Sequence, residues 1–245
     1  MPVFTSQRVC VQFINMNNKK CIHKIKNNCD VSTTFIILCS QKSNKRGYKN
    51  IPLTVLDNKN FLIDEQIQTI RSSYPDSEII IISGFEHDKL VSHIHSKKYK
   101  NIRIAENKYH KMSSALDCWI FGLNLALPQN TYIIHGDRLF NKSCISPSNN
   151  KQTHTIIHNE DKNNYDIGLL IDGGKLLNMS YGLPNVWSEI LFINESDFDI
   201  ARNLINDHVK RKFYNLESFI NTLLNQITIS VIKKKQDDIK TLKEL

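Results

Sequence analysis

Between residues 35 and 140, short apolar runs alternate with longer segments in which apolar residues recur at helical spacing. Runs that are apolar on both sides are typical of strands buried on both faces of a sheet. In Phe61–Ser73, isoleucines at positions 63, 67 and 70 define one face of an amphipathic helix. This alternation predicts an α/β fold with a Rossmann-like, mostly parallel sheet and flanking helices. The runs are Phe35–Leu38, Glu78–Ile82, Ile102–Ala105 and Tyr132–Ile134.

Beyond Ser146 the pattern becomes one of short strands joined by Asn-rich or Gly-Gly turns. This predicts a small antiparallel layer of hairpins. The predicted strands here are 153–158, 167–172, 176–179, 188–193 and 227–232, with helices at 198–209 and 216–226 and a short charged tail at 233–245.

The first 32 residues are predicted to be an extension before a single domain at 33–245. Val9, Val11 and Phe13 alternate with polar residues, and a second apolar group follows a turn-rich segment, which is typical of a β-hairpin. Such a hairpin could pair along a sheet edge. It could also dock a protein partner or a second copy of the chain through residues 1–30.

The chain of 245 residues has a formal net charge of +8, which favours polyanions such as nucleotides. Its positive residues are scattered rather than gathered into a basic helix or an aromatic platform, so nucleic acid is an unlikely partner. The abundance of Lys, Asn and Ile is typical of a low-GC bacterium or a virus. No apolar run approaches the roughly 18 residues of a membrane span.

The six cysteines show no paired C-x-x-C spacing, which argues against a zinc site and for a reducing compartment. We expect a cytoplasmic location, or the host cytoplasm or a virion if the source is viral.

The segment Thr131–Phe140 contains the strongest candidate for a metal ligand. An apolar strand ends there in His135-Gly136-Asp137, and Gly136 can adopt a backbone conformation closed to other residues. Asp137 would lie at the carboxyl end of a central strand, where open α/β sheets place their ligands. Its carboxylate would suit Mg²⁺. The alternative is an aspartate in a strand-ending turn.

The order of these segments resembles the nucleotidyltransferase family that activates sugar phosphates or choline phosphate with NTPs. The resemblance spans most of residues 33–245. It rests on Phe35–Leu38, the Pro52 segment, Glu78–Gly84, Glu106–Tyr109 with the following Ser113-Ser114, and Ile134–Asp137. It implies a GT-A-like fold in which an acceptor phosphate attacks an NTP and expels pyrophosphate, with Mg²⁺ as cofactor if the chain is active.

The same resemblance shows what this chain lacks. The family's phosphate loop has glycines where this chain has Ser40 and Lys42, and an arginine where it has Asn44. Its Pro-Lys pair is replaced by Pro52-Leu53. Its second metal-binding aspartate is replaced by Lys240, which would form an ion pair beside Asp137. A slip in register would offer Asp237 or Asp238 instead.

We therefore predict a nucleotidyltransferase-like protein that has lost catalysis and acts as a binding, regulatory or structural module. One alternative is an active transferase with a remodelled phosphate loop, and another is an assembly component of a virion or enzyme complex that docks through its N-terminal arm. The ligand would be a nucleotide or sugar nucleotide. The candidate catalytic residues are Lys42 and Arg46; the candidate ligand-binding residues are Ser40, Lys42, Lys45, Arg46, Asn107 and Ser114; the candidate metal ligands are Asp137 and Asp238.

Four other residues are expected to have structural rather than catalytic roles. Trp119 is expected in the core, and packing is favoured for Trp187, which could also line a pocket. His135 is expected to end a strand, with contact to a ligand as the alternative, and Glu217 is expected to face solvent.

Overall fold

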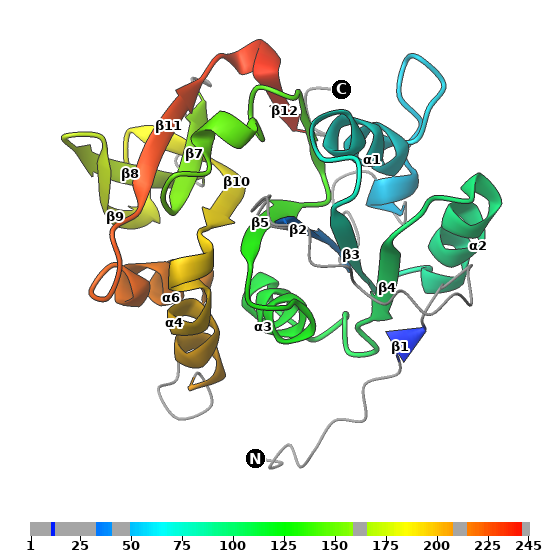
Figure 1. Ribbon diagram of the computed structural model, residues 1–245, viewed down its shortest axis with the longest axis horizontal. Helices are drawn as coiled ribbons and strands as arrows, with labels where there is room; N and C mark the ends of the chain where they lie inside the picture. The colour runs from blue at the N-terminus through cyan, green and yellow to red at the C-terminus, as the bar shows by residue number, and fades with distance from the viewer. Residues whose placement is uncertain (1–10, 13–32, 41–49, 159–165, 208–214, 242–245) are drawn as a thin grey trace, which may run out of the picture.

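The computed structural model describes residues 11–12, 33–40, 50–158, 166–207 and 215–241, which form a mixed α/β fold (Figure 1). The main helices are α1 (Leu62–Ser73), α2 (His87–Lys97), α3 (Ala115–Leu125), α4 (Glu195–Asn206) and α6 (Leu216–Leu223), with short 3-10 turns η1 (Ile51–Leu53), η2 (Pro147–Asn149) and η3 (Gln236–Asp238). The strands are β1 (Val11–Gln12), β2 (Thr33–Cys39), β3 (Glu78–Ser83), β4 (Ile102–Glu106), β5 (Asn130–His135), β6 (Arg138–Phe140), β7 (His154–His158), β8 (Ile167–Asp172), β9 (Lys175–Tyr181), β10 (Asn185–Ile193), β11 (Ser230–Lys234) and β12 (Ile239–Thr241).

Ten of the described strands form one sheet in the order β1-β4-β3-β2-β5-β10-β7-β11-β9-β8. Strands β4, β3, β2 and β5 are parallel, as the alternation of strands and helices predicts. The sheet as a whole is mixed rather than mostly parallel, because β10 runs antiparallel to both β5 and β7. The antiparallel strands beyond Ser146 therefore extend the main sheet. The predicted antiparallel strands are thus present, as part of this sheet rather than as a layer of their own.

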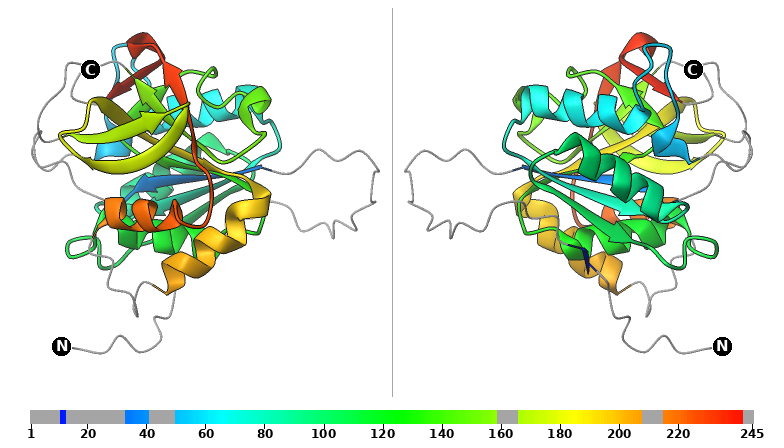
Figure 2. Two further views of the ribbon diagram at one scale, coloured as in Figure 1. Left: turned by 90° about the vertical axis from the view of Figure 1, so that its left-hand side faces the viewer. Right: turned by 90° about the vertical axis from the view of Figure 1, so that its right-hand side faces the viewer.

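Two hydrophobic cores lie on opposite faces of the sheet (Figure 2). Helices α1 and α2 pack on one face, over residues that include Phe35 and Tyr132. Helices α3, α4 and α6 pack on the other, where Trp119 and Phe219 are buried. Each fully buried side chain of this size stabilises the fold by about 1.5–3 kcal/mol, so both faces of the central strands are strongly fixed.

The beginning of α3 is set by a capping box. The Ser114 hydroxyl accepts a hydrogen bond from the Asp117 amide at 3.2 Å, and the Asp117 carboxylate accepts one from the Ser114 amide at 2.7 Å. These bonds satisfy backbone donors that the first helical turn leaves free. Ser114 is thus the N-cap of α3.

The C-terminal segment differs from its prediction. Lys233 and Lys234 belong to β11, which begins later than the predicted strand, and Ile239–Thr241 forms β12. Strand β12 pairs with β6 in a two-stranded antiparallel sheet, so 233–241 is not a charged tail. Ile239 is fully buried and anchors this segment. In the sequence it is a single apolar residue among charged neighbours, so its burial could not be predicted from the pattern.

At the other end of the chain, β1 pairs antiparallel with β4 at the sheet edge. This is the edge-pairing alternative for Val11 and Gln12. The rest of the predicted hairpin lies outside the described residues, so the hairpin, the boundary at residue 32 and the docking role stay predictions. No helix in the described part of the chain is both long and apolar enough to cross a membrane.

Candidate functional site

The candidate site lies where β5 ends and the chain turns into β6. His135 is the last residue of β5, Gly136 and Asp137 form the turn, and Arg138 begins β6. Because β2 runs parallel to β5, the carboxyl ends of the two strands meet at this edge of the sheet. This is the edge at which open α/β sheets bind their ligands.

Glu189 reaches the same edge from β10. The pairing of Ile190 with Ile134 brings Glu189 beside the end of β5. Strand β10 carries a bulge between Trp187 and Leu191, and Glu189 has a positive φ of 59°. Such a conformation is uncommon for a residue with a side chain, and bulges re-aim side chains beside functional sites. The bulge thus directs a carboxylate towards Asp137.

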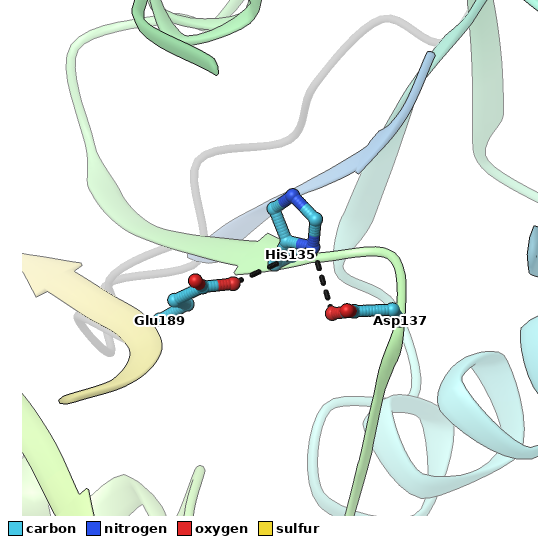
Figure 3. A group of neighbouring side chains, drawn as sticks. All are labelled: His135, Asp137 and Glu189. Atoms are coloured by element: carbon cyan, nitrogen blue, oxygen red, sulfur yellow. Dashed lines mark hydrogen bonds and ion pairs between the residues drawn. The ribbon is translucent and has the colours of Figure 1, made fainter. Parts of the chain in front are cut away.

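Figure 3 shows His135 between the two carboxylates. Its Nδ1 lies 2.7 Å from Asp137 Oδ1 and 3.5 Å from Glu189 Oε2. The three side chains are 21–28% exposed, so they are sheltered but open to a ligand. One ligand atom from each lies within 4.8 Å of the others, which is compact enough to surround a cation.

The guanidinium of Arg138 also joins this group. Its Nη2 lies 2.8 Å from Glu189 Oε2 and its Nε 3.3 Å from Asp137 Oδ1, and the side chain is only 10% exposed. Arg138 therefore bridges the two carboxylates. We call His135, Asp137, Arg138 and Glu189 the four-residue ion cluster.

Burial disfavours the charged form of His135, but the carboxylates of Asp137 and Glu189 outweigh it and raise the pKa of His135 to about 9. Burial likewise disfavours the charged form of Asp137. His135 and Arg138 outweigh it and hold the pKa of that carboxyl well below its ordinary value. At neutral pH the cluster thus carries two positive and two negative charges, and it is neutral overall.

A glycine is needed at position 136 because a side chain there would collide with its neighbours. Gly136 is not among the described glycines with positive φ, which corrects the expectation of an unusual backbone conformation. A Cβ at this position would lie 2.6 Å from the Leu38 carbonyl oxygen and 2.8 Å from Cys39 Sγ. The Gly136 amide donates to that same carbonyl at 2.9 Å. The glycine thus lets β5 and β2 stay in contact where the cluster begins.

Gly136→Ala should accordingly lower the free energy of unfolding by about 1–3 kcal/mol, the usual cost of forcing an atom into a filled space. Urea denaturation of the two proteins measures this difference. Adding Cys39→Ala should not restore stability, because the clash with the Leu38 carbonyl persists. Restoration would place the constraint on the thiol instead.

Three of the predicted ligand-binding residues have structural partners. The Ser40 hydroxyl is buried and lies 2.8 Å from Cys118 Sγ. The Asn107 amide donates to the Ser113 hydroxyl at 2.8 Å, and its oxygen accepts from the Tyr109 amide at 3.1 Å. With Ser114 capping α3, these groups hold the segment before the helix in place. Their role in ligand binding stays a prediction.

The other predicted residues do not join Asp137 in the described part of the chain. Lys42, Lys45 and Arg46 lie outside the described residues. Asp238 lies in η3, where its carboxylate accepts hydrogen bonds from the Asn141 side chain and the Lys235 amide. Lys240 pairs with Leu139 across β12 and β6, and the described cations paired with Asp137 are His135 and Arg138. The expected ion pair between Lys240 and Asp137 is therefore not formed.

A pocket of about 190 Å³ opens beside the cluster. Trp119 and Trp187 contribute buried aromatic surface, and both the His135 and Glu189 side chains reach its lining. The pocket extends to the beginning of α6, where Glu217 lines it. The remaining lining residues are Leu38, Ser114, Ala115, Leu116, Ile167, Tyr181, Asn215 and Leu216.

Sequence reasoning missed Glu189 and Arg138 and placed Glu217 wrongly. Glu217 is 6% exposed and lines the pocket rather than facing solvent. It lies in the first turn of α6, which borders the pocket. The available signal for Glu189 was an acidic residue inside an otherwise apolar strand. Trp119 and Trp187 are in the core as expected, and both also line the pocket.

The donors of the cluster do not fit a resident Mg²⁺. Magnesium prefers oxygen ligands in octahedral geometry, and one of the three grouped donors is an imidazole nitrogen. The carboxylate oxygens that would face the ion already contact Arg138 and His135. Arg138 and His135 thus balance the negative charge of Asp137 and Glu189, which a bound dication would otherwise balance.

The arrangement of strands and helices is the GT-A-like nucleotidyltransferase fold. The chain superposes on CTP:phosphocholine cytidylyltransferase from Streptococcus pneumoniae with a TM-score of 0.74 and 13% identity, over 88% of this chain and 95% of that one. The inositol-1-phosphate CTP transferase from T. maritima superposes with a TM-score of 0.64 and 9% identity, over 84% of this chain and 87% of that one. The nucleoside-diphosphate-sugar pyrophosphorylase from Vibrio cholerae superposes with a TM-score of 0.68 and 11% identity, over 85% of this chain and 95% of that one. No family model and no curated sequence matches the chain.

Proposed function

We propose that this chain binds a nucleotide or a phosphorylated small molecule on a nucleotidyltransferase fold without transferring a nucleotidyl group. The observation that carries the proposal is the pairing of Asp137 and Glu189 with Arg138 and His135. Phosphoryl chemistry of this kind depends on preorganised cationic stabilisation of the phosphates. Here the best-placed cations are instead engaged with protein carboxylates.

The sequence supports the same conclusion from other positions. Ser40 and Lys42 stand where the family that the chain resembles has glycines, and Leu53 stands where it has a lysine. Losing one preorganised donor costs on the order of 100-fold in rate, so the combined loss removes most of the catalytic stabilisation. The fold and the pocket beside His135 still offer a place for a ligand.

A pyrophosphate-release assay tests this proposal. The chain is incubated with each of the four NTPs, Mg²⁺, and either sugar phosphates or choline phosphate. We expect no release above the rate without protein. Release that requires Mg²⁺ and disappears in Asp137→Asn would overturn the proposal.

Binding is measured separately by calorimetric titration with the same NTPs. We expect binding that is equally tight in Mg²⁺ and in a chelator, because the ion cluster is already neutral. Tight binding that requires the metal and is abolished by Asp137→Ala would contradict the proposal.

One observation favours an active transferase as the second candidate. Glu189 offers a second carboxylate near Asp137, the role that the sequence had assigned to Asp238. In that case a substrate-bound dication would displace Arg138 and His135 from the carboxylates. Pyrophosphate release in the assay above would favour this candidate.

A further inference from the structure

The pocket beside the ion cluster contains one carboxylate that no described residue neutralises. Glu217 lines the pocket, is 6% exposed, and its Oε1 has no hydrogen-bond partner among the residues that the structure describes. Burying an unpartnered charged oxygen is costly, and a bound ligand is one way to satisfy such a group.

The charges around the pocket show what that partner would need. Four of the charged groups, His135, Asp137, Arg138 and Glu189, pair with one another and sum to zero. Among the described residues, this leaves Glu217 as the uncompensated charge of the lining. The hydroxyl of Tyr181 interacts with Glu217 and brings no positive charge, and that interaction raises the pKa of Tyr181. A cation is therefore the complement of this end of the pocket.

The walls favour the same ligand chemistry. Trp119, Trp187 and Tyr181 provide aromatic surface, and a cation near an aromatic face is stabilised by the charge distribution of the ring. The Trp187 indole N–H is already bonded to Thr155 Oγ1 at 2.7 Å, so it does not compete for the carboxylate. A quaternary ammonium would satisfy the aromatic walls, but it has no N–H to give to the free oxygen.

We propose that this pocket binds a small ligand through a protonated primary amine, with the ammonium group donating to Glu217. This inference deepens the proposed function and depends on it, since it names the chemical class of the ligand. A volume of about 190 Å³ limits the ligand part inside the pocket to a small group. The rest of the ligand would extend past His135 towards the ion cluster.

The tryptophans allow a direct test, because the two in the sequence are Trp119 and Trp187 and both line the pocket. Intrinsic fluorescence is titrated with ethanolamine, with choline, and with neutral ethylene glycol at constant ionic strength. We expect a saturable change with ethanolamine at an affinity at least about tenfold above that for either of the other two, in line with a hydrogen bond to a charged group.

Glu217→Gln should weaken ethanolamine about tenfold or more, and Glu195→Gln, at an exposed position of α4, is the matched control that should leave it unchanged. Circular dichroism verifies folding, and if Glu217→Gln unfolds, the comparison of ligands on the wild-type chain decides alone. Equal binding of ethylene glycol, tighter binding of choline, or an unchanged affinity in folded Glu217→Gln would overturn the inference. None of these results affects the pyrophosphate assay, so a failure of this inference can be distinguished from a failure of the proposed function.

Discussion

Arg138→Gln is expected to lower the free energy of unfolding by about 3–5 kcal/mol, the range found when one partner of a buried ion pair is removed. The guanidinium is 10% exposed and contacts both Asp137 and Glu189. Without it, two neighbouring carboxylates share one protonated imidazole, and the cluster carries a net negative charge. Urea denaturation at pH 7 measures the loss.

The same variant should gain affinity for divalent cations. With Arg138 replaced, a metal ion can take the place between the carboxylates, and carboxylate oxygens are ligands that suit Mn²⁺. Added Mn²⁺ at about 100 times its dissociation constant should restore about 2.7 kcal/mol of stability. If the wild-type chain is stabilised by Mn²⁺ as strongly as the variant, the arginine does not stand in for a metal.

Arg202→Gln is the matched control for this experiment. Arg202 pairs with Asp199 one turn away on α4, and the Asp199 side chain is 61% exposed. Exposed pairs of this kind contribute about 0–1 kcal/mol. The control should therefore unfold close to wild type and show no response to Mn²⁺.

The elements of this fold with a local signal could be predicted from the sequence. The spacing of three isoleucines places α1 within one residue of its observed beginning, and serine at 114 caps α3 as its residue type suggests. These signals lie within a few residues of one another, so they survive without knowledge of the rest of the chain.

The ion cluster could not be predicted in the same way, because it is made by contacts between distant residues. Glu189 reaches His135 only through the antiparallel pairing of β10 with β5 and through a bulge that has no clear sequence signature. A strand pattern tells which residues are buried but not which strand lies alongside. The burial of Glu217 similarly depends on where the first turn of α6 packs.

In the C-terminal segment, by contrast, the family pattern predicts the wrong neighbour for Asp137. Lys240 was expected beside Asp137 because it occupies the position of a metal ligand in the family that the chain resembles. In the structure it faces Leu139 in the pairing of β12 with β6, and Arg138 supplies the cation instead. The expected cation beside Asp137 is present, but it comes from the residue directly after Asp137.

The stability contributed by His135 should fall as the pH rises towards 10. The pKa of His135 is about 9 in the folded chain against an ordinary value of 6.5. A pKa raised by folding means that the folded state binds the proton more tightly. The contribution is therefore complete below about pH 6.5 and is lost as the pH rises through 9. At 1.36 kcal/mol per unit, the shift corresponds to roughly 3 kcal/mol.

The measurement is urea denaturation between pH 6 and about pH 10 on the wild type and His135→Gln, since glutamine keeps a hydrogen-bond donor but has no proton to lose. The difference between the two proteins should be largest near pH 6 and shrink by roughly 3 kcal/mol above pH 9. His95→Gln, on the exposed side of α2, should parallel the wild type throughout. Parallel profiles for His135→Gln and the wild type would mean that His135 is neutral in the cluster. The carboxylates of Asp137 and Glu189 would then have Arg138 as their one cationic partner in the cluster. The cluster would carry a net negative charge, which a bound metal ion could balance.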